Sequence, residues 1–354
     1  MIEPTFLSSI KAPTIVGFEV TPSCNRRCEY CEPSKVSPNG YFTQNPLSTD
    51  EIKKIIDKIS EAEIHYIFLT GGELTLRKDL PEIVKRCYEK EIFPNLLTNA
   101  EVVDKELVKR LFDLGMENVQ ISVEGTEKFH DNVTQSPNSF KKVKRGIEIF
   151  FRGGFNVYVT SIALRKTLPS LPDLVRQLPE IGVYGYGTVK LRVHKKEDLN
   201  MVPPKRLLIK CNQEIREACK DSGVELLKLY EGLGISKHTI PDTHYPSSYV
   251  CNMGKIKMEI LSDGSVVPCK SLKRPYFVVG NLLKDDIQHV WNHPTMKMFR
   301  YMTPDDYKGT CGVCDYRQSC HCCRAVAYNL TGDIFGEDLT CYKLAEENNR
   351  KELL

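Results

Sequence analysis

The chain has 354 residues and a net charge of +3. This length allows one large α/β domain and a smaller one, since domains commonly span ~100–200 residues. The Lys and Arg residues are scattered, which argues against nucleic acid as a partner. No apolar run reaches the ~20 residues needed to cross a bilayer, and the amino terminus does not resemble a secretory signal. We therefore expect no membrane partner and a cytoplasmic location.

Fourteen cysteines are many for a chain without an export signal. In a reducing compartment, clustered cysteines indicate metal binding rather than disulfides. Ten of the fourteen fall into groups with ligand-like spacing. Cys87, Cys211 and Cys219 lie in helical patterns and are expected to be buried, inert thiols. Cys322 belongs to no group.

From residue 14 to about residue 222, short β-branched runs alternate with amphipathic helices. The predicted strands are the runs 14–20, 66–70, 95–98, 119–123, 157–164 and 189–193. Between them, we expect helices to begin at Ser48, Asp104 and Ser139, where capping residues precede an apolar face. This alternation indicates a parallel sheet with right-handed crossovers. Six repeats fit a partial, open barrel better than a complete eight-fold one.

The chain changes character after the last of these helices. Residues 223–250 are rich in Gly, Pro, Tyr and His and are predicted to form a linker or lid. From residue 251 onward the alternation stops and cysteines dominate. The sequence therefore predicts an α/β barrel domain over 1–222, a linker over 223–250, and a small cysteine-rich domain over 251–354.

Three cysteines near the amino terminus carry the strongest functional signal. Cys24, Cys28 and Cys31 place three thiolates within eight residues, so one loop can wrap a soft metal centre. Structural zinc sites and electron-carrying clusters usually close with four protein ligands, and three leave one position free for a cofactor or substrate. Because the triplet follows the run 14–20, we expect it at the carboxyl ends of the strands, where α/β proteins bind ligands.

This triplet, with the aromatic Tyr30 before its third cysteine, resembles the radical S-adenosylmethionine (SAM) superfamily. The resemblance implies a (β/α)6 core and a 4Fe–4S cluster on Cys24, Cys28 and Cys31. The open iron would chelate the amino and carboxylate groups of SAM, and reductive cleavage would yield a 5′-deoxyadenosyl radical. The alternative is a chance Cys-x2-Cys pair that binds zinc or is simply buried.

Gly71-Gly72-Glu73 follows the second predicted strand. Two glycines let the backbone approach a ligand closely, and the neighbouring carboxylate can hold an ammonium group. Alone, this tripeptide is often a turn. After a cysteine triplet it resembles the superfamily motif that binds the amino group of SAM, although Leu74 stands in place of the usual proline.

Polar residues end the next two predicted strands. Asn99 closes the third strand, and Ser122 with Glu124 closes the fourth. The resemblance implies that these residues and Tyr30 contact SAM, with Ser122 and Glu124 at the ribose hydroxyls. The alternative is that they only cap the strand ends.

The carboxyl-terminal cysteines follow the pattern Cys251, Gly264-x4-Cys269, Cys311-x2-Cys314-x5-Cys320-x2-Cys323 and Cys341. This pattern resembles the SPASM domain, which carries two auxiliary 4Fe–4S clusters in peptide and cofactor maturases. By analogy, the second auxiliary cluster takes Cys311, Cys314, Cys320 and Cys341.

The first auxiliary cluster would take Cys251, Cys269 and Cys323, one ligand short of four. Either one iron is open and can bind a substrate heteroatom, or Cys322 completes the set. We favour the open site, because adjacent cysteines rarely bind one cube without strain, which leaves Cys322 a spare thiol. His321 is predicted to be a loop residue, and Trp291 a core anchor.

The resemblance implies an enzyme that abstracts hydrogen from a substrate. Two auxiliary clusters favour a net oxidation of the substrate because they can accept the extra electron. The product would then be a cross-link, a thioether, a dehydrogenated product or an oxidatively decarboxylated one. A reading in which the clusters only carry electrons or sense redox state fits Gly71-Gly72-Glu73 poorly. No general acid, base or radical-quenching residue can be assigned from the sequence.

The predicted substrate is a ribosomally made peptide. Because the chain is expected to begin directly at the barrel, this prediction requires either a separate leader-peptide-binding protein or a short substrate. Oxidative chemistry on a tetrapyrrole or haem precursor is the second alternative, favoured by the Cys-x2-Cys-Arg spacing at 320–324. A small aminosugar-like metabolite, dehydrogenated or epimerised, is the third. Flavodoxin or ferredoxin is the expected electron donor.

Overall fold

The computed structural model describes residues 10–31, 46–232, 251–318, 320, 322–347 and 350. Its framework is a ten-stranded sheet in the order β10-β9-β8-β1-β2-β3-β4-β5-β6-β7. The strands are β1 (Ile15–Thr21), β2 (Tyr66–Gly71), β3 (Phe93–Thr98), β4 (Asn118–Ser122), β5 (Asn156–Ile162), β6 (Val183–Val189), β7 (Glu225–Leu226), β8 (Lys257–Ile260), β9 (Ser265–Val267) and β10 (Gly280–Asn281). Neighbours from β8 through β1 to β7 pair in parallel, and β9 and β10 pair antiparallel.

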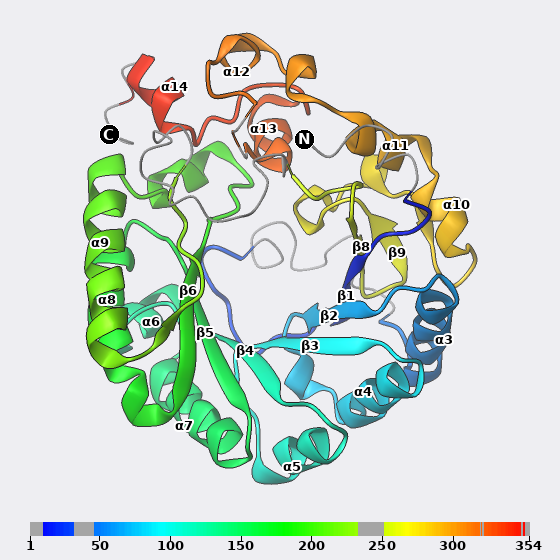
Figure 1. Cartoon of the computed structure of the whole chain (residues 1–354), viewed down its shortest axis with the longest axis vertical. Coiled ribbons are helices and arrows are strands. Elements are labelled where there is room, and N and C mark those ends of the chain that lie inside the picture. Colours follow the sequence, from blue (N-terminus) through cyan, green and yellow to red (C-terminus); the bar gives the residue numbers. More distant parts are fainter. Residues whose placement is uncertain are drawn as a thin grey trace.

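Helices cover the outer face of this curved sheet (Figure 1). They are α3 (Thr49–Glu61), α4 (Leu80–Glu89), α5 (Lys105–Asp113), α6 (Glu127–Thr134), α7 (Ser139–Arg152), α8 (Leu171–Gln177) and α9 (Lys205–Ser222). Alternate residues of β1, namely Val16, Phe18 and Val20, are fully buried in the core between sheet and helices. Because side chains alternate along a strand, Gly17 and Glu19 face the barrel interior.

The local signals at the first two helix starts are confirmed. Ser48 and Glu51 form a complete capping box at the start of α3. The Asp104 carboxylate accepts a hydrogen bond from the backbone N–H of Leu107 at 2.8 Å. Helix α7 spans Ser139–Arg152 and so begins at the predicted residue, but its N-cap is Asn138 and no side chain caps it, so Ser139 is not the capping residue that we expected.

The sixth strand was predicted in the wrong place. The run 189–193 overlaps β6 only at Val189. The strand itself spans Val183–Val189 and contains Gly185 and Gly187. These glycines weaken a strand signal, but they let the following chain pack closely: a Cβ on Gly187 would lie 2.8 Å from the Lys228 carbonyl oxygen. As a result β7, inside the predicted linker 223–250, joins the sheet beside β6. Residues 233–250 lie outside the described part of the chain.

The barrel is open, and the carboxyl-terminal segment bridges its two sides. Helix α13 (Arg324–Thr331) carries Asn329, whose amide donates to the Val193 carbonyl beyond β6 and to the Ser271 carbonyl beyond β9, each at 3.3 Å. Figure 1 shows this segment at the top of the view, together with α12 (Gly309–Val313) and α14 (Tyr342–Glu347). The predicted partial α/β barrel with a small carboxyl-terminal domain is therefore confirmed.

The remaining core predictions also agree with the structure. Trp291, at the end of α10 (Ile287–Trp291) and before α11 (Pro294–Tyr301), is fully buried and donates to the Ile10 carbonyl. Cys87, Cys211 and Cys219 are buried thiols of α4 and α9. Among the described residues, no helix has the length and apolarity that a membrane crossing requires.

Gly146 gives a direct test of how α7 docks on the sheet. In an unconstrained helix, Gly→Ala stabilises by about 1 kcal/mol. Here a Cβ would lie 2.0 Å from the Ala100 carbonyl oxygen just beyond β3, and overpacking costs about 1–3 kcal/mol. We expect Gly146→Ala to lower the thermal midpoint, and Lys144→Ala on the exposed face of α7 to leave it unchanged. A raised midpoint for Gly146→Ala would contradict this packing.

Candidate metal and cofactor site

The loop that carries Cys24, Cys28 and Cys31 follows β1 and packs directly on the end of β2. The backbone N–H of Gly72 donates to the Thr21 carbonyl at 2.8 Å, and that of Glu73 to the Ser23 carbonyl at 2.7 Å. A Cβ on Gly72 would lie 2.2 Å from the Ser23 carbonyl oxygen, and one on Gly71 would lie 2.4 Å from that of Thr21. These two glycines therefore allow the backbone of the cysteine loop to lie directly against the end of β2.

A buried ion pair holds the same loop against the end of β3. Arg26 lies between the first two cysteines, and its Nε is 2.7 Å from Glu101 Oε1, with both side chains 2% exposed. Asn25 donates to the other Glu101 oxygen at 2.7 Å, and Arg26 also donates to the Asn99 carbonyl. Removing either partner would leave a buried charge without a counter-charge, which is strongly destabilising.

The network continues from Glu101 to β4. Ser139 at the start of α7 donates to Glu101, and His130 Nε2 lies 2.9 Å from the Ser139 hydroxyl. His130 Nδ1 accepts from the backbone N–H of Glu124 at 2.9 Å. Burial lowers the pKa of His130 to about 3, so the ring is neutral with its proton on Nε2. Hydrogen bonds thus link the cysteine loop to the ends of β3 and β4.

Glu73 is 1% exposed, and its carboxylate is occupied within the protein. One oxygen accepts from the backbone N–H and hydroxyl of Thr75 and from the hydroxyl of Thr98. The other accepts from the backbone N–H of Asn99 at 2.6 Å. Glu73 therefore ties the end of β2 to the end of β3, a structural role that the sequence did not indicate.

Tyr30 and Glu124 lie together across the same edge of the sheet. The Tyr30 hydroxyl donates to Glu124 Oε1 at 2.8 Å, and the backbone N–H of Ile162 donates to Oε2 at 2.8 Å. Glu124 is 1% exposed, and burial raises its pKa. Ser122 is half-buried at the end of β4. The residues expected near SAM thus share the carboxyl ends of β2, β3 and β4.

The three loop thiols are half-buried and fit a metal cluster chemically. Burial raises the pKa of the Cys28 thiol to about 12, so it is a thiolate at neutral pH only when a metal lowers that pKa. Within the described ranges, no three His, Cys, Asp or Glu side chains converge on a point that would hold a single metal ion. In a 4Fe–4S cube each thiolate binds a different iron, which requires wider spacing.

Cys251, Cys269 and Cys323 are brought together from three separate segments. Burial is the main cause of the raised pKa of Cys251, to about 12, and Cys323 and Cys269 add to it. Cys269 likewise adds to the effect of burial on the pKa of Cys323. These are the three residues that the resemblance assigns to the first auxiliary cluster.

A second group lies nearby. A hydrogen bond with Cys322 is the main cause of the raised pKa of Cys320, and burial and the nearby Cys341 add to it. Burial is the main cause of the raised pKa of Cys341, and Cys311 adds to it. Cys314 accepts from Lys343 at 3.9 Å, two residues after Cys341. Cys322 is 3% exposed and lies against Cys320 and Tyr307, at the boundary between the two groups. His321 lies outside the described residues.

A second buried ion pair connects the barrel to the first of these groups. Lys190 directly follows β6, and its Nζ lies 3.0 Å from the Asp338 carboxylate, which is fully buried. Asp338 also accepts from the backbone N–H of Cys323 at 2.7 Å and from Thr340. Burial alone would raise the pKa of Asp338, but Lys190 and these donors keep it below its usual value.

Sequence reasoning missed Arg26, Glu101, His130, Lys190 and Asp338. Arg26 lies between the first two cysteines of the triplet, and Glu101 lies two residues beyond Asn99. Their closeness in sequence to these motifs is the one signal that could have indicated a role. The partners are 75 and 148 residues apart in the two ion pairs. No local pattern reveals such contacts.

Comparison with known proteins agrees with this geometry. Residues 18–177 match the model of the radical SAM superfamily, and residues 251–324 match that of the SPASM iron–sulfur cluster-binding domain. The chain is 25% identical over 351 residues to AdoMet-dependent heme synthase of Methanosarcina barkeri, covering 95% of this chain and 98% of that protein. It is 26% identical over 345 residues to PqqA peptide cyclase of Bradyrhizobium diazoefficiens, covering 93% and 86%.

The fold is shared with Streptococcus suis SuiB, whose structure was solved with its precursor peptide SuiA. The TM-score is 0.76 at 15% sequence identity, over 95% of this chain and 77% of that one. Both matched families are defined by iron–sulfur chemistry, and the cysteines of both lie in this chain at the positions described above. Residues 18–177 therefore form a radical SAM domain and residues 251–324 a SPASM domain, and the chain is an iron–sulfur enzyme.

Proposed function

We propose that this enzyme uses SAM to oxidise a ribosomally made peptide. The observation that supports the proposal most is the position of the two cysteine regions on one open barrel. The triplet loop follows β1, and Lys190, which directly follows β6, binds the Asp338 that also holds Cys323. Both regions therefore lie at the carboxyl ends of parallel strands, where a substrate can reach both. Relatives include a peptide cyclase, and SuiB is a peptide-bound neighbour in fold.

In this proposal Cys24, Cys28 and Cys31 hold one 4Fe–4S cluster beside the SAM pocket. The pocket is lined by Tyr30, Asn99, Ser122 and Glu124. The segment Gly71-Gly72-Glu73 forms its base. Glu73 would act through the backbone it positions, because its carboxylate is already occupied. When bound, the cluster and SAM supply a radical that removes a hydrogen atom from the substrate.

The carboxyl-terminal domain would hold two auxiliary 4Fe–4S clusters. Cys251, Cys269 and Cys323 are the proposed ligands of the first, and Cys311, Cys314, Cys320 and Cys341 are those of the second. Asp338 and Lys190 keep Cys323 in place. Flavodoxin or ferredoxin remains the proposed electron donor, and a separate leader-peptide-binding protein the proposed partner.

A second candidate, oxidation of a tetrapyrrole side chain, is favoured by a group of cations around Glu259 of β8. Lys257 pairs with Glu259 at 3.1 Å, but the neighbouring Lys270 and Arg192 make no hydrogen bond or ion pair with any described residue. Two unpaired cations suit a carboxylate, which tetrapyrrole side chains carry. The end-to-end similarity to a heme synthase is consistent with this candidate.

Anaerobic incubation with SAM, a reductant and the candidate substrate tests the proposed function. A precursor peptide encoded beside this gene should lose the mass of two hydrogen atoms as 5′-deoxyadenosine forms. Loss of carbon dioxide from a tetrapyrrole, with the peptide unchanged, would favour the second candidate. SAM cleavage that is coupled to neither substrate would contradict both.

Replacing the three cysteines of the loop tests whether they bind a cluster independently of the carboxyl-terminal cysteines. Three cubes correspond to about twelve irons per chain. The Cys24→Ala, Cys28→Ala, Cys31→Ala triple variant should retain about eight irons, since two cubes would remain, and should form no 5′-deoxyadenosine. Iron analysis and chromatography measure the two outcomes. Persistent SAM cleavage, or stoichiometric zinc in the wild-type protein, would refute the assignment.

Cys322→Ala tests whether the first auxiliary cluster has an open iron. We expect the variant to keep its full iron content, because Cys322 lies against Cys320 and Tyr307 and its neighbour Cys323 already serves the cluster. Cys323→Ala is the matched control and should lose about four irons, as loss of one cube requires. An equal loss in Cys322→Ala would make Cys322 the fourth ligand.

A further inference from the structure

Two buried arginines of the carboxyl-terminal half stack on aromatic rings. The Arg300 guanidinium lies 4.0 Å from the centre of the Trp291 ring, and that of Arg324 lies 4.1 Å from the centre of the Tyr307 ring. Arg300 is 3% exposed and Arg324 1%. Since water cannot solvate such groups, their N–H donors need acceptors in the protein or in a ligand.

The two arginines differ in how their donors are used. Arg300 donates through Nε to the Gly254 carbonyl at 3.0 Å and through Nη2 to the Trp291 carbonyl at 2.7 Å. Arg324 donates through Nη1 alone, to the carbonyls of Ile334 and Gly336. Its Nε and Nη2 are buried and have no hydrogen-bond partner among the described residues. Arg324 is thus held in a fixed plane with two nitrogens unsatisfied.

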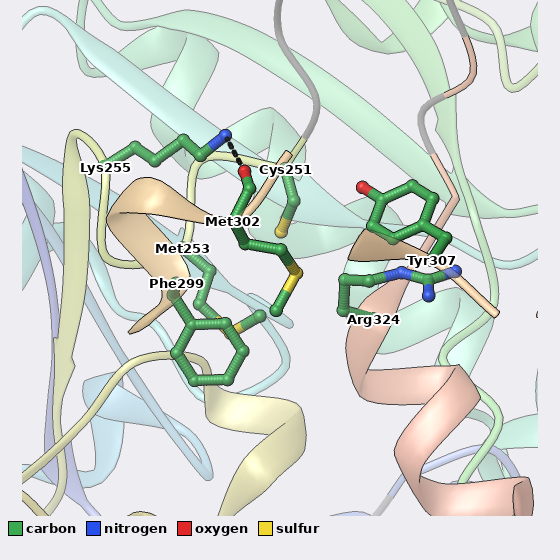
Figure 2. A pocket seen from close by; sticks show the side chains of 7 residues that line it. All are labelled: Cys251, Met253, Lys255, Phe299, Met302, Tyr307 and Arg324. Carbon is green, nitrogen blue, oxygen red and sulfur yellow. Dashed lines mark hydrogen bonds between the residues drawn. The ribbon is translucent and has the colours of Figure 1, made fainter. Parts of the chain in front are cut away.

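Arg324 lines a cavity together with Cys251, and its guanidinium lies beside the Tyr307 ring (Figure 2). The cavity is lined by Cys251, Met253, Lys255, Phe299, Met302, Tyr307 and Arg324. This lining contains two cations and no carboxylate, and Lys255 already donates to the Met302 carbonyl at 3.1 Å. The nearby Asp338 carboxylate accepts from Lys190, Cys323 and Thr340. The surroundings therefore favour an anionic occupant with several acceptor atoms.

We propose that Arg324 donates its free N–H groups to sulfur atoms of the auxiliary cluster that Cys251 ligates, and that this raises the reduction potential of that cluster. The inference rests on the proposed function, which places a cluster on Cys251, Cys269 and Cys323. A cube with thiolate ligands is anionic, and hydrogen bonds to its sulfurs favour the more negative, reduced state. Arg324 is then a positioning residue that makes this cluster a better electron acceptor, as net substrate oxidation requires.

Potentiometric titration followed by electron paramagnetic resonance tests this role. At a fixed solution potential, Arg324→Met should lower the reduced-to-oxidised ratio of one auxiliary cluster at least tenfold, equivalent to ~59 mV for a one-electron couple. Arg324→Lys should lower it less, because it keeps the charge but loses the planar donors. Arg300→Met is the matched control and should lower the thermal midpoint without moving any potential.

The affected cluster is identified in a Cys251→Ala background. There, Arg324→Met should move no remaining potential, because the cluster it contacts has been removed. A shift of the second auxiliary cluster in that background would overturn the proposal, as would unchanged potentials in Arg324→Met alone.

Isotope labelling of arginine tests the role of Arg324 in the wild-type protein, so the result does not depend on whether a variant folds. Wild-type protein grown with ¹⁵N-arginine should show a ¹⁵N hyperfine coupling to a reduced auxiliary cluster, and the coupling should persist in Arg300→Met. A wild-type protein with reduced auxiliary clusters but no such coupling would overturn the role of Arg324 and leave the proposed function intact. Wild-type protein without auxiliary clusters would instead refute the proposed function.

Discussion

The close contact between the cysteine loop and two glycines is the constraint on which the site depends. A side chain on Gly72 would collide with the Ser23 carbonyl oxygen at 2.2 Å, so only glycine allows the loop to lie on the end of β2. The loop is then fixed from a second side by Arg26 and Glu101. Because parallel strands end at one edge, the residues expected near SAM follow from this single placement.

The open barrel explains why the carboxyl-terminal segment is integral to the site. A sheet that does not close leaves two separate sides, and α13 connects them because Asn329 donates to the segments that follow β6 and β9. Lys190 and Asp338 add a buried ion pair that joins the end of β6 to the backbone of Cys323. A single side chain, that of Asp338, therefore connects the end of β6 to the backbone of Cys323.

Much of the fold could be predicted because its signals are local. The first five strands were found from periodicity, and the helix starts at Ser48 and Asp104 from capping. Helix α7 also begins at Ser139, although Asn138 occupies its N-cap. The sixth strand was misplaced because Gly185 and Gly187 hide a strand whose stability comes from packing against β7. The inclusion of β8, β9 and β10 in the same sheet depends on pairing between β1 and β8, which are more than two hundred residues apart.

The same distinction between local sequence signals and long-range contacts applies to the candidate site. Cysteine spacing gives the three thiols of the loop and the carboxyl-terminal set as candidate ligands, because metal ligands are constrained in residue type and in separation. The role of Glu73 could not be predicted, since its partners Thr98 and Asn99 reach it only after β2 and β3 have paired. Nor does any pattern reveal that Arg324 is left with free donors while Arg300 is not.

Anomalous diffraction at the iron edge, from crystals grown without oxygen, tests the central claim most directly. The account predicts three separate iron clusters: one against Cys24, Cys28 and Cys31, one against Cys251, Cys269 and Cys323 with Arg324 beside it, and one against Cys311, Cys314, Cys320 and Cys341. Zinc at these cysteines, or a carboxyl-terminal domain without iron, would contradict it.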